Sequence, residues 1–278
     1  MESVPSLFIG TIILRPYVFA FLLAYLLGCS LHLGVKRALY FCVAGYLIAW
    51  LSEYSSIHNG FPYGPYYYIE TTKNKELWLL GVPFMDSLSY VFLAYASYST
   101  ALVVVSPLVR IKGMFYPLVN RGTRNSLQAR IMGAIFFVYL DIIIDPVALK
   151  GNKWFLGRIY GYPEPGAYFG VPISNFIGWF VVGFLMITAL QAIDAYPDKK
   201  GAADHAGHNY PWSCYVGPFL YLSVVIFNLA VTFAIGETTM GWAGVFIMLL
   251  FLLLVSYIVK IRLSINTAAN VNRKDTNI

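Results

Sequence analysis

Charged side chains are scarce in this sequence of 278 residues, because Asp, Glu, Lys and Arg make up only 12% of it. Soluble domains carry about 25% charged residues, so this chain lacks the polar surface that a globular fold in water needs. Hydrophobic residues account for 59% of the chain, and the mean hydropathy is +0.66. These values exclude the soluble globular class and indicate an integral membrane protein.

Cysteine and histidine are also rare, with three and four residues. Cys29 and Cys42 lie in apolar runs, where cysteine is typical of small packing positions. His205 and His208 stand three residues apart in a polar loop that offers too few further ligands for a metal. The net charge of the chain is +6. In membrane proteins such an excess of Lys and Arg lies in the cytoplasmic loops, so it does not indicate binding of nucleic acid. We therefore expect no metal, no cofactor and no nucleic-acid partner.

Long apolar runs fill most of the sequence. A membrane-spanning helix takes ~20 residues to cross the hydrocarbon layer. Seven runs reach that length, and each is apolar around its whole circumference, as lipid-facing helices are. The runs are 16–34, 37–57, 84–107, 129–149, 172–193, 213–235 and 240–260. The sequence therefore predicts an all-α polytopic transmembrane helix bundle, with residues 1–264 as a single domain and 265–278 as a polar C-terminal tail.

Lysine and arginine are divided unevenly between the two sides that seven spans define. Thirteen of the 19 lie near residue 36, in the loops 108–130 and 194–212, or at the C-terminal end. Cytoplasmic loops carry such an excess, so the N-terminus is predicted outside and the C-terminus in the cytoplasm of a multi-pass cell-membrane protein. The loops 58–83 and 150–171 then lie on the outer side. A short apolar run at 5–14 is expected on the membrane surface or as an extension of the first helix.

Acidic residues inside or next to the apolar runs are the first candidates for function. A carboxylate at mid-membrane costs ~2.5–3.5 kcal/mol on insertion scales, so such groups face the bundle interior. Asp141 and Asp145 share one helix face, and in a low dielectric we expect one protonated and one ionised carboxyl group. Pro146 is expected to loosen the backbone at Asp145. The candidate catalytic residues are Asp145, Asp141, Asp86 and Glu53.

A structural reading of these acids stays open, because intramembrane acids also lock helices together through hydrogen bonds. Glu237, between the last two runs, is interpreted as part of a solvated turn.

An aromatic segment, HNGFPYGPYYY, follows the second run. Its Gly and Pro residues exclude a helix, and its Tyr rings supply flat apolar faces whose negative charge density stabilises cations. Such a surface suits a long, flat, apolar ligand, although an aromatic belt at the headgroups is the alternative. The candidate substrate-binding residues are His58, Tyr63, Tyr66, Tyr67, Asn175 and Trp179.

Several blocks of the sequence resemble one known family. They are RPYVFAFLLAYL at 15–26, EYSSIHNGFPYGPYYY at 53–68, ELWLLGVPFMDSLSYVFLAYASY at 76–98, DIIIDPVALKGNKW at 141–154 and GAYFGVPISNFIGW at 166–179. Together they are similar to the membrane-bound carotenoid biosynthesis proteins, which include CruF-type carotenoid 1,2-hydratases and archaeal bisanhydrobacterioruberin hydratases. The resemblance covers about residues 15–195 and is limited to hydropathy beyond them.

The resemblance implies a hydratase that adds water across the terminal C1–C2 double bond of an acyclic carotenoid or related isoprenoid. Hydration of such an alkene requires a proton donor, a stabilised tertiary cation and a positioned water molecule. We expect Asp145 to act as the acid, with Asp141, Asp86 or Glu53 orienting the water. The expected partners are a polyene or isoprenoid substrate from the bilayer, membrane lipids and other carotenoid enzymes.

Three other functions stay open on the sequence. An intramembrane isoprenoid transferase or cyclase would use Asp residues to bind Mg²⁺, with Lys150 and Lys153 near the diphosphate. A transporter also carries intramembrane acids and broken helices. A structural role within a carotenoid-forming complex is the third.

Overall fold

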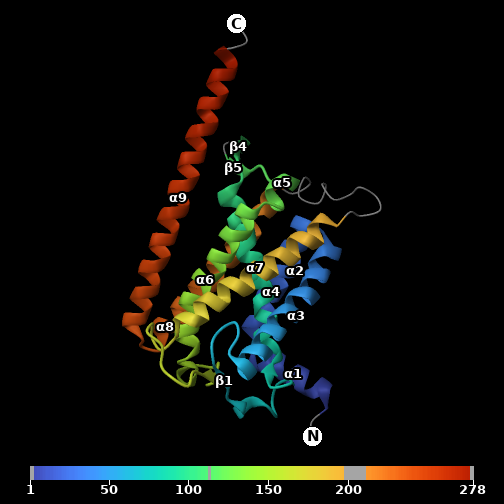
Figure 1. The fold of residues 1–278 in the computed structure, drawn as a ribbon, viewed down its shortest axis with the longest axis vertical. Coiled ribbons are helices and arrows are strands. Elements are labelled where there is room, and N and C mark those ends of the chain that lie inside the picture. Colours follow the sequence, from blue (N-terminus) through green and yellow to red (C-terminus); the bar gives the residue numbers. More distant parts are fainter. Residues whose placement is uncertain (1–2, 112–113, 197–210, 276–278) are drawn as a thin grey trace.

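The computed structural model describes residues 3–111, 114–196 and 211–275 and shows a bundle of long helices (Figure 1). Within these residues, seven helices are long and apolar enough to cross a membrane, which confirms the predicted all-α polytopic class. They are α2 (Pro16–Leu33), α3 (Val35–Asn59), α4 (Phe84–Val105), α6 (Leu127–Ala148), α7 (Ile173–Ala195), α8 (Val216–Ala234) and α9 (Thr238–Asp275). Helix α9 continues through most of the segment predicted to be a polar tail.

Short elements lie at the two ends of the bundle. The helix α1 (Val4–Leu14) precedes α2, and α5 (Arg121–Arg124) precedes α6. Each of the three strand pairs is antiparallel. The pairs are β1 (Tyr67–Tyr68) with β6 (Tyr160–Gly161), β2 (Trp78–Leu79) with β3 (Val82–Pro83), and β4 (Leu108–Ile111) with β5 (Met114–Pro117). The single-turn 3₁₀ helices are η1 (Glu70–Thr72), η2 (Gly151–Lys153) and η4 (Pro211–Tyr215).

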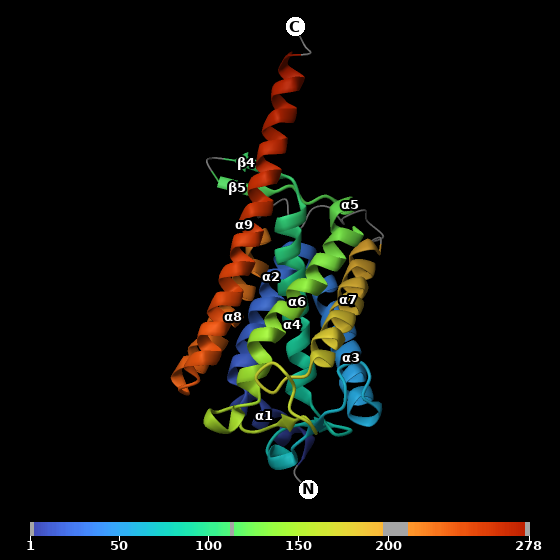
Figure 2. The ribbon, with the colours of Figure 1, turned by 60° about the vertical axis from the view of Figure 1, so that its left-hand side comes forward.

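Helix α4 runs through the middle of the bundle (Figures 1 and 2). In the most apolar 18-residue stretch of α4, 89% of the residues are buried, whereas the corresponding value for α9 is 11%. Gly133 of α6 permits a close approach to α4, because a Cβ atom at this position would lie 3.3 Å from the Cα atom of Tyr98. The prediction that every span faces lipid is therefore wrong for α4, although its mean hydropathy of 1.6 is close to the 1.7 of α2, of which only 33% is buried.

Helix α6 does not loosen at Pro146, in contrast to the prediction. The helix continues to Ala148, and the amide of Leu149 donates to the carbonyl oxygen of Asp145 at 3.0 Å. Proline removes one hydrogen-bond donor from a helix. Because α6 ends two residues after Pro146, the loss falls in the last turn, where few intrahelical bonds remain to be broken.

At the end where the N-terminus lies, a buried ion pair joins three segments. Arg15, between α1 and α2, donates two hydrogen bonds of 2.9 Å to the carboxylate of Glu76. Its third nitrogen donates to the carbonyl oxygen of Leu156. Both charged side chains are buried. The pair ties the start of α2 to the loops 60–83 and 149–172, which cover this end of the bundle.

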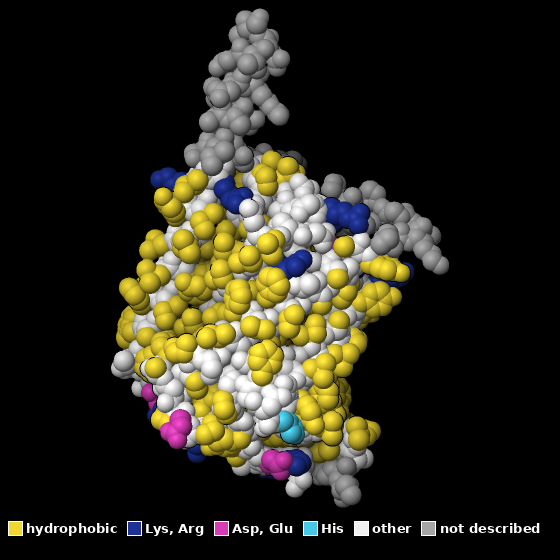
Figure 3. Space-filling model, viewed as in Figure 1, with side chains coloured by type: hydrophobic (Ala, Val, Ile, Leu, Met, Phe, Trp, Pro, Cys, Tyr) yellow, Lys and Arg dark blue, Asp and Glu magenta, His cyan; other side chains and the backbone are white. Residues whose placement is uncertain are grey.

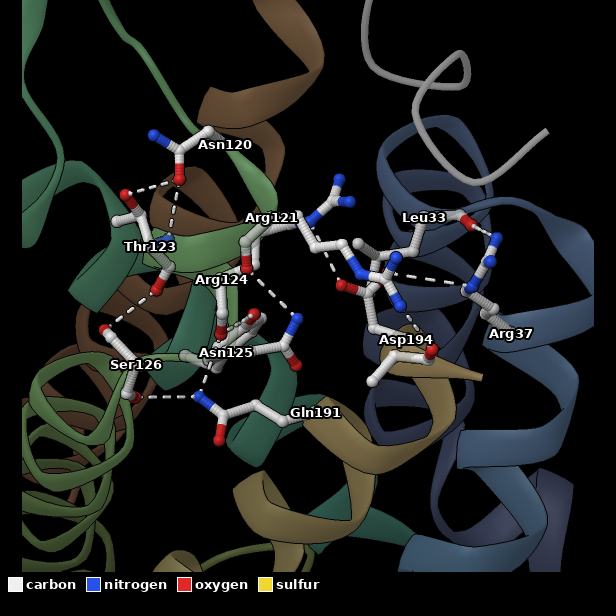
Figure 4. Close-up of polar contacts among 12 residues, drawn as sticks. Leu33, Arg37, Asn120, Arg121, Thr123, Arg124, Asn125, Ser126, Gln191 and Asp194 are labelled. Carbon is white, nitrogen blue, oxygen red and sulfur yellow. Dashed lines mark hydrogen bonds and ion pairs between the residues drawn. The ribbon is translucent and has the colours of Figure 1, made fainter. Parts of the chain in front are cut away.

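A second polar cluster lies at the opposite end, where α3, α6 and α7 converge (Figure 4). Arg124 contacts the carboxylate of Asp194 at 3.0 Å, and Arg37 approaches it at 3.6 Å. Gln191 donates to the backbone oxygen of Arg124 at 2.8 Å and accepts from Arg130 at 2.8 Å. These contacts fix the helix ends. In the face shown in Figure 3, most Lys and Arg side chains gather toward this end and the Asp and Glu side chains toward the other.

Candidate active site

A cavity opens inside the bundle, near the end covered by the loops 60–83 and 149–172, and it encloses about 920 Å³ of empty space when the part open to solvent is included. Its walls come from α2, α3, α4, α6, α7 and α8, together with residues of both loops. Most of the lining is aromatic or aliphatic, and three carboxyl groups reach it, those of Glu53, Asp86 and Asp145. A mostly apolar pocket with a few convergent polar groups is the usual form of a small-molecule site.

One wall is built around Asp145. The hydroxyl group of Tyr160 donates to Oδ1 of Asp145 at 2.9 Å, and that of Tyr162 donates to Oδ2 at 2.9 Å. The amide of Asn175 donates to the same Oδ2 at 2.7 Å and to Oδ2 of Asp141 at 2.8 Å. Asp145 therefore accepts three hydrogen bonds, while Asp141 is fully buried beside it and does not line the cavity.

The other wall carries Glu53 and Asp86, which one tyrosine bridges. The hydroxyl oxygen of Tyr68 lies 2.7 Å from Oδ2 of Asp86 and 3.1 Å from Oε1 of Glu53. Ser87 donates a further hydrogen bond to Oε2 of Glu53. Glu53 is 1% exposed, whereas Asp86 is half-buried at the cavity wall.

Tyr66 stands between the two walls. Its ring is 5.3 Å from the ring of Tyr68 on one side, and 6.3 and 6.4 Å from those of Tyr160 and Tyr162 on the other. Burial, reinforced by the neighbouring acidic groups, raises the pKa of all four phenols well above the usual value. Each hydroxyl group therefore keeps its proton at neutral pH and acts as a donor.

A stack of rings forms the apolar floor of the cavity. The indole of Trp179 lies 4.6 Å from the ring of Tyr90 at an interplanar angle of 21°, and 4.6 Å from the ring of Phe137. Tyr63 packs over this stack because Gly178 has no side chain there. A Cβ atom at Gly178 would lie 2.6 Å from the Tyr63 ring.

The structure brings most of the predicted site residues together. Seven of them line the cavity, and Asp141 lies behind Asn175. The seven are Glu53, Tyr63, Tyr66, Asp86, Asp145, Asn175 and Trp179.

Two predicted residues, His58 and Tyr67, do not belong to the cavity lining. The side chain of His58 is exposed, and its Nδ1 atom lies 2.7 Å from the carbonyl oxygen of Tyr54 in its own helix. The ring of Tyr67 is 44% exposed. Successive side chains of a strand point to opposite faces, so Tyr67 points away where Tyr68 points inward. His205 and His208 lie outside the described residues.

Five tyrosines that line the cavity were not among the residues predicted from the sequence, namely Tyr17, Tyr68, Tyr90, Tyr160 and Tyr162. The pairing of β1 with β6 places Tyr68 opposite Tyr160, across about 90 residues of sequence. The sequence Tyr160-Gly161-Tyr162 does indicate that the two tyrosines lie together, because residues two apart in an extended segment share one face.

Fold and site together define a multi-pass membrane protein with an aromatic cavity that carries acids on two walls. The family model described as "Carotenoid biosynthesis protein" matches residues 8–254. The chain therefore belongs to the carotenoid biosynthesis protein family, which gives it a role in carotenoid biosynthesis and indicates an enzymatic one. No significant match was found among curated proteins or among solved structures.

Proposed function

We propose that the protein is an intramembrane hydratase that adds water across the terminal C1–C2 double bond of an acyclic carotenoid or a related isoprenoid. One observation carries the proposal, which is the placement of carboxyl groups on both walls of an otherwise aromatic and aliphatic cavity. Membership of the carotenoid biosynthesis family supports the substrate class.

The cavity holds the groups that each step of such a hydration requires. A carboxylic acid adds a proton to C2, and the π electrons of the double bond form the new C–H bond. The tertiary cation left at C1 is stabilised by carboxylates and by the faces of Tyr66, Tyr90 and Trp179. A water oxygen then bonds to C1, and a carboxylate removes the extra proton. The product is a tertiary alcohol, heavier than the substrate by one water.

The substrate of this proposal is an apolar molecule that resides in the bilayer, and the product stays there. We therefore place the protein in the cell membrane, in contact with lipid and with other enzymes of carotenoid synthesis. The aromatic rings of the cavity surround one end of a polyene, and the rest of the polyene extends beyond the enclosed space. Asn175 acts by holding Asp145 and Asp141 in place through its amide.

The test is expression in a host that accumulates an acyclic carotene, with the pigments resolved by chromatography and mass spectrometry. A new, more polar pigment heavier by one water is expected from the wild type and from Glu70→Gln, an exposed glutamate outside the cavity. Loss of that pigment is expected from Asp145→Asn in protein that still inserts into the membrane. Unchanged pigment with the wild-type protein present would refute the hydratase. Product that forms only with added Mg²⁺ would favour a transferase or cyclase instead.

A further inference from the structure

The bridge between Glu53 and Asp86 limits where protons reside. A phenol has a single proton to donate, and its oxygen otherwise only accepts. The hydroxyl oxygen of Tyr68 nevertheless lies within hydrogen-bond distance of one oxygen of each carboxyl group. Tyr68 donates to one of them, so the other contact needs a proton from the carboxyl group itself. One of the two acids is therefore protonated when the bridge is intact.

The distances and burial indicate which acid holds that proton. Hydrogen bonds from a hydroxyl group to an ionised carboxylate are short, about 2.5–2.7 Å. The contact of Tyr68 with Asp86 is 2.7 Å, and that with Glu53 is 3.1 Å. Glu53 is also almost completely buried, where an isolated charge is costly. The order of donation is then Glu53 to Tyr68 to Asp86.

The opposite wall has the reverse arrangement. Asp145 is surrounded by donors, since two phenols and one amide all direct hydrogens at its oxygens. A carboxyl group that accepts three hydrogen bonds is held in its ionised form. This differs from the role of acid that the sequence suggested for Asp145.

We propose that the chain Glu53–Tyr68–Asp86 is the proton donor of the hydration and that Asp145 is the carboxylate that receives a proton from the attacking water. The assignment rests on the proposed hydratase function and specifies how its site works. Asp86 is the delivering group because it is the more exposed of the two at the cavity wall, whereas the almost completely buried Glu53 is the store of the proton. Tyr68 passes the proton between them.

The O–H bond of Glu53 breaks as Tyr68 takes its proton and gives its own to Asp86, which transfers that proton to C2. The oxygen of water bonds to C1, and its proton passes to Asp145. One turnover thus moves one proton from the first wall to the second. The cycle closes when Asp145 returns it through Tyr66, which stands between the walls, or through water in the cavity.

Infrared spectroscopy of the purified protein tests the protonation states without any need for activity. The carbonyl stretch of a protonated carboxyl group is separate from the bands of a carboxylate. Glu53→Gln keeps a donor toward Tyr68 but removes the acid, so it is expected to lose one protonated-carboxyl band. Asp145→Asn is expected to keep that band and lose carboxylate absorption. A Glu53→Gln spectrum with no fewer protonated-carboxyl bands than the wild type, or loss of that same band in Asp145→Asn, overturns the assignment.

Turnover in D₂O separates the two roles. With Asp145→Asn, the donor chain still protonates the alkene reversibly, so recovered substrate is expected to contain deuterium although no alcohol forms. Glu53→Gln and Tyr68→Phe are expected to give neither deuterium nor alcohol. Deuterium in substrate recovered from Glu53→Gln, or none from Asp145→Asn, overturns the roles. A wild type that hydrates nothing refutes the hydratase itself, and the infrared bands then still decide the protonation of the two walls.

Discussion

Removal of Arg15 is expected to destabilise the covered end of the bundle severely. Its guanidinium makes two hydrogen bonds to Glu76 and one to the backbone of Leu156, and both charged groups are buried. Arg15→Met leaves the carboxylate of Glu76 buried, with Thr72 as its remaining hydrogen-bond donor among the described contacts. Breaking a buried pair by removing one partner costs about 3–5 kcal/mol. At 1.4 kcal/mol per factor of ten, the ratio of folded to unfolded protein falls by roughly two to three and a half orders of magnitude.

The measurement is chemical denaturation of the purified protein in mixed micelles, with two comparisons. Lys73→Met breaks the exposed pair with Glu70, whose side chains are 48% and 55% exposed, and such pairs contribute about 0–1 kcal/mol. The double variant Arg15→Met with Glu76→Met removes both charges and is expected to lose less stability than Arg15→Met alone. If Arg15→Met is no more destabilising than Lys73→Met, the ion pair does not hold this end together.

Three further predictions concern the site and its surroundings. Tyr68→Phe is expected to lower the rate of product formation by about 10²–10⁴-fold, the usual contribution of general acid–base groups, with unfolding midpoints near wild type; a wild-type rate would show that the bridge carries no proton. Gly178→Ala is expected to cost about 1–3 kcal/mol, because its Cβ would meet the backbone of Tyr63 at 2.7 Å, and an unchanged unfolding midpoint would contradict that packing. The ion pair with Lys153 lowers the pKa of Glu237, so the pair stabilises the protein above the usual glutamate value of 4.5 and loses that effect as pH falls through the lowered pKa. The difference in stability between wild type and Glu237→Gln should therefore shrink on acidification. A difference that grows would show that the pair does not stabilise the ionised form of Glu237.

The acids of the site could be predicted because their cost in a membrane makes them stand out from sequence. Glu53, Asp86 and Asp145 each interrupt an apolar run, and all three line the cavity. The tyrosines were harder to select, because Tyr rings are common at membrane interfaces and composition does not separate a wall from a belt. Tyr67 and Tyr68 are neighbours in sequence, yet only Tyr68 lines the cavity.

By itself, the sequence determined the class of the protein, the positions of its seven spans and the acids that face the interior. These properties depend on hydropathy and length, which are local and additive along the chain. The tertiary structure decided which span is central, which acids form pairs and which phenol bridges them. Such contacts join residues of different helices and loops, as Tyr160 and Asn175 do at Asp145 and Tyr68 does at Glu53. They arise only when helices and loops pack, because the direction of a hydrogen bond depends on atomic positions that no local pattern specifies.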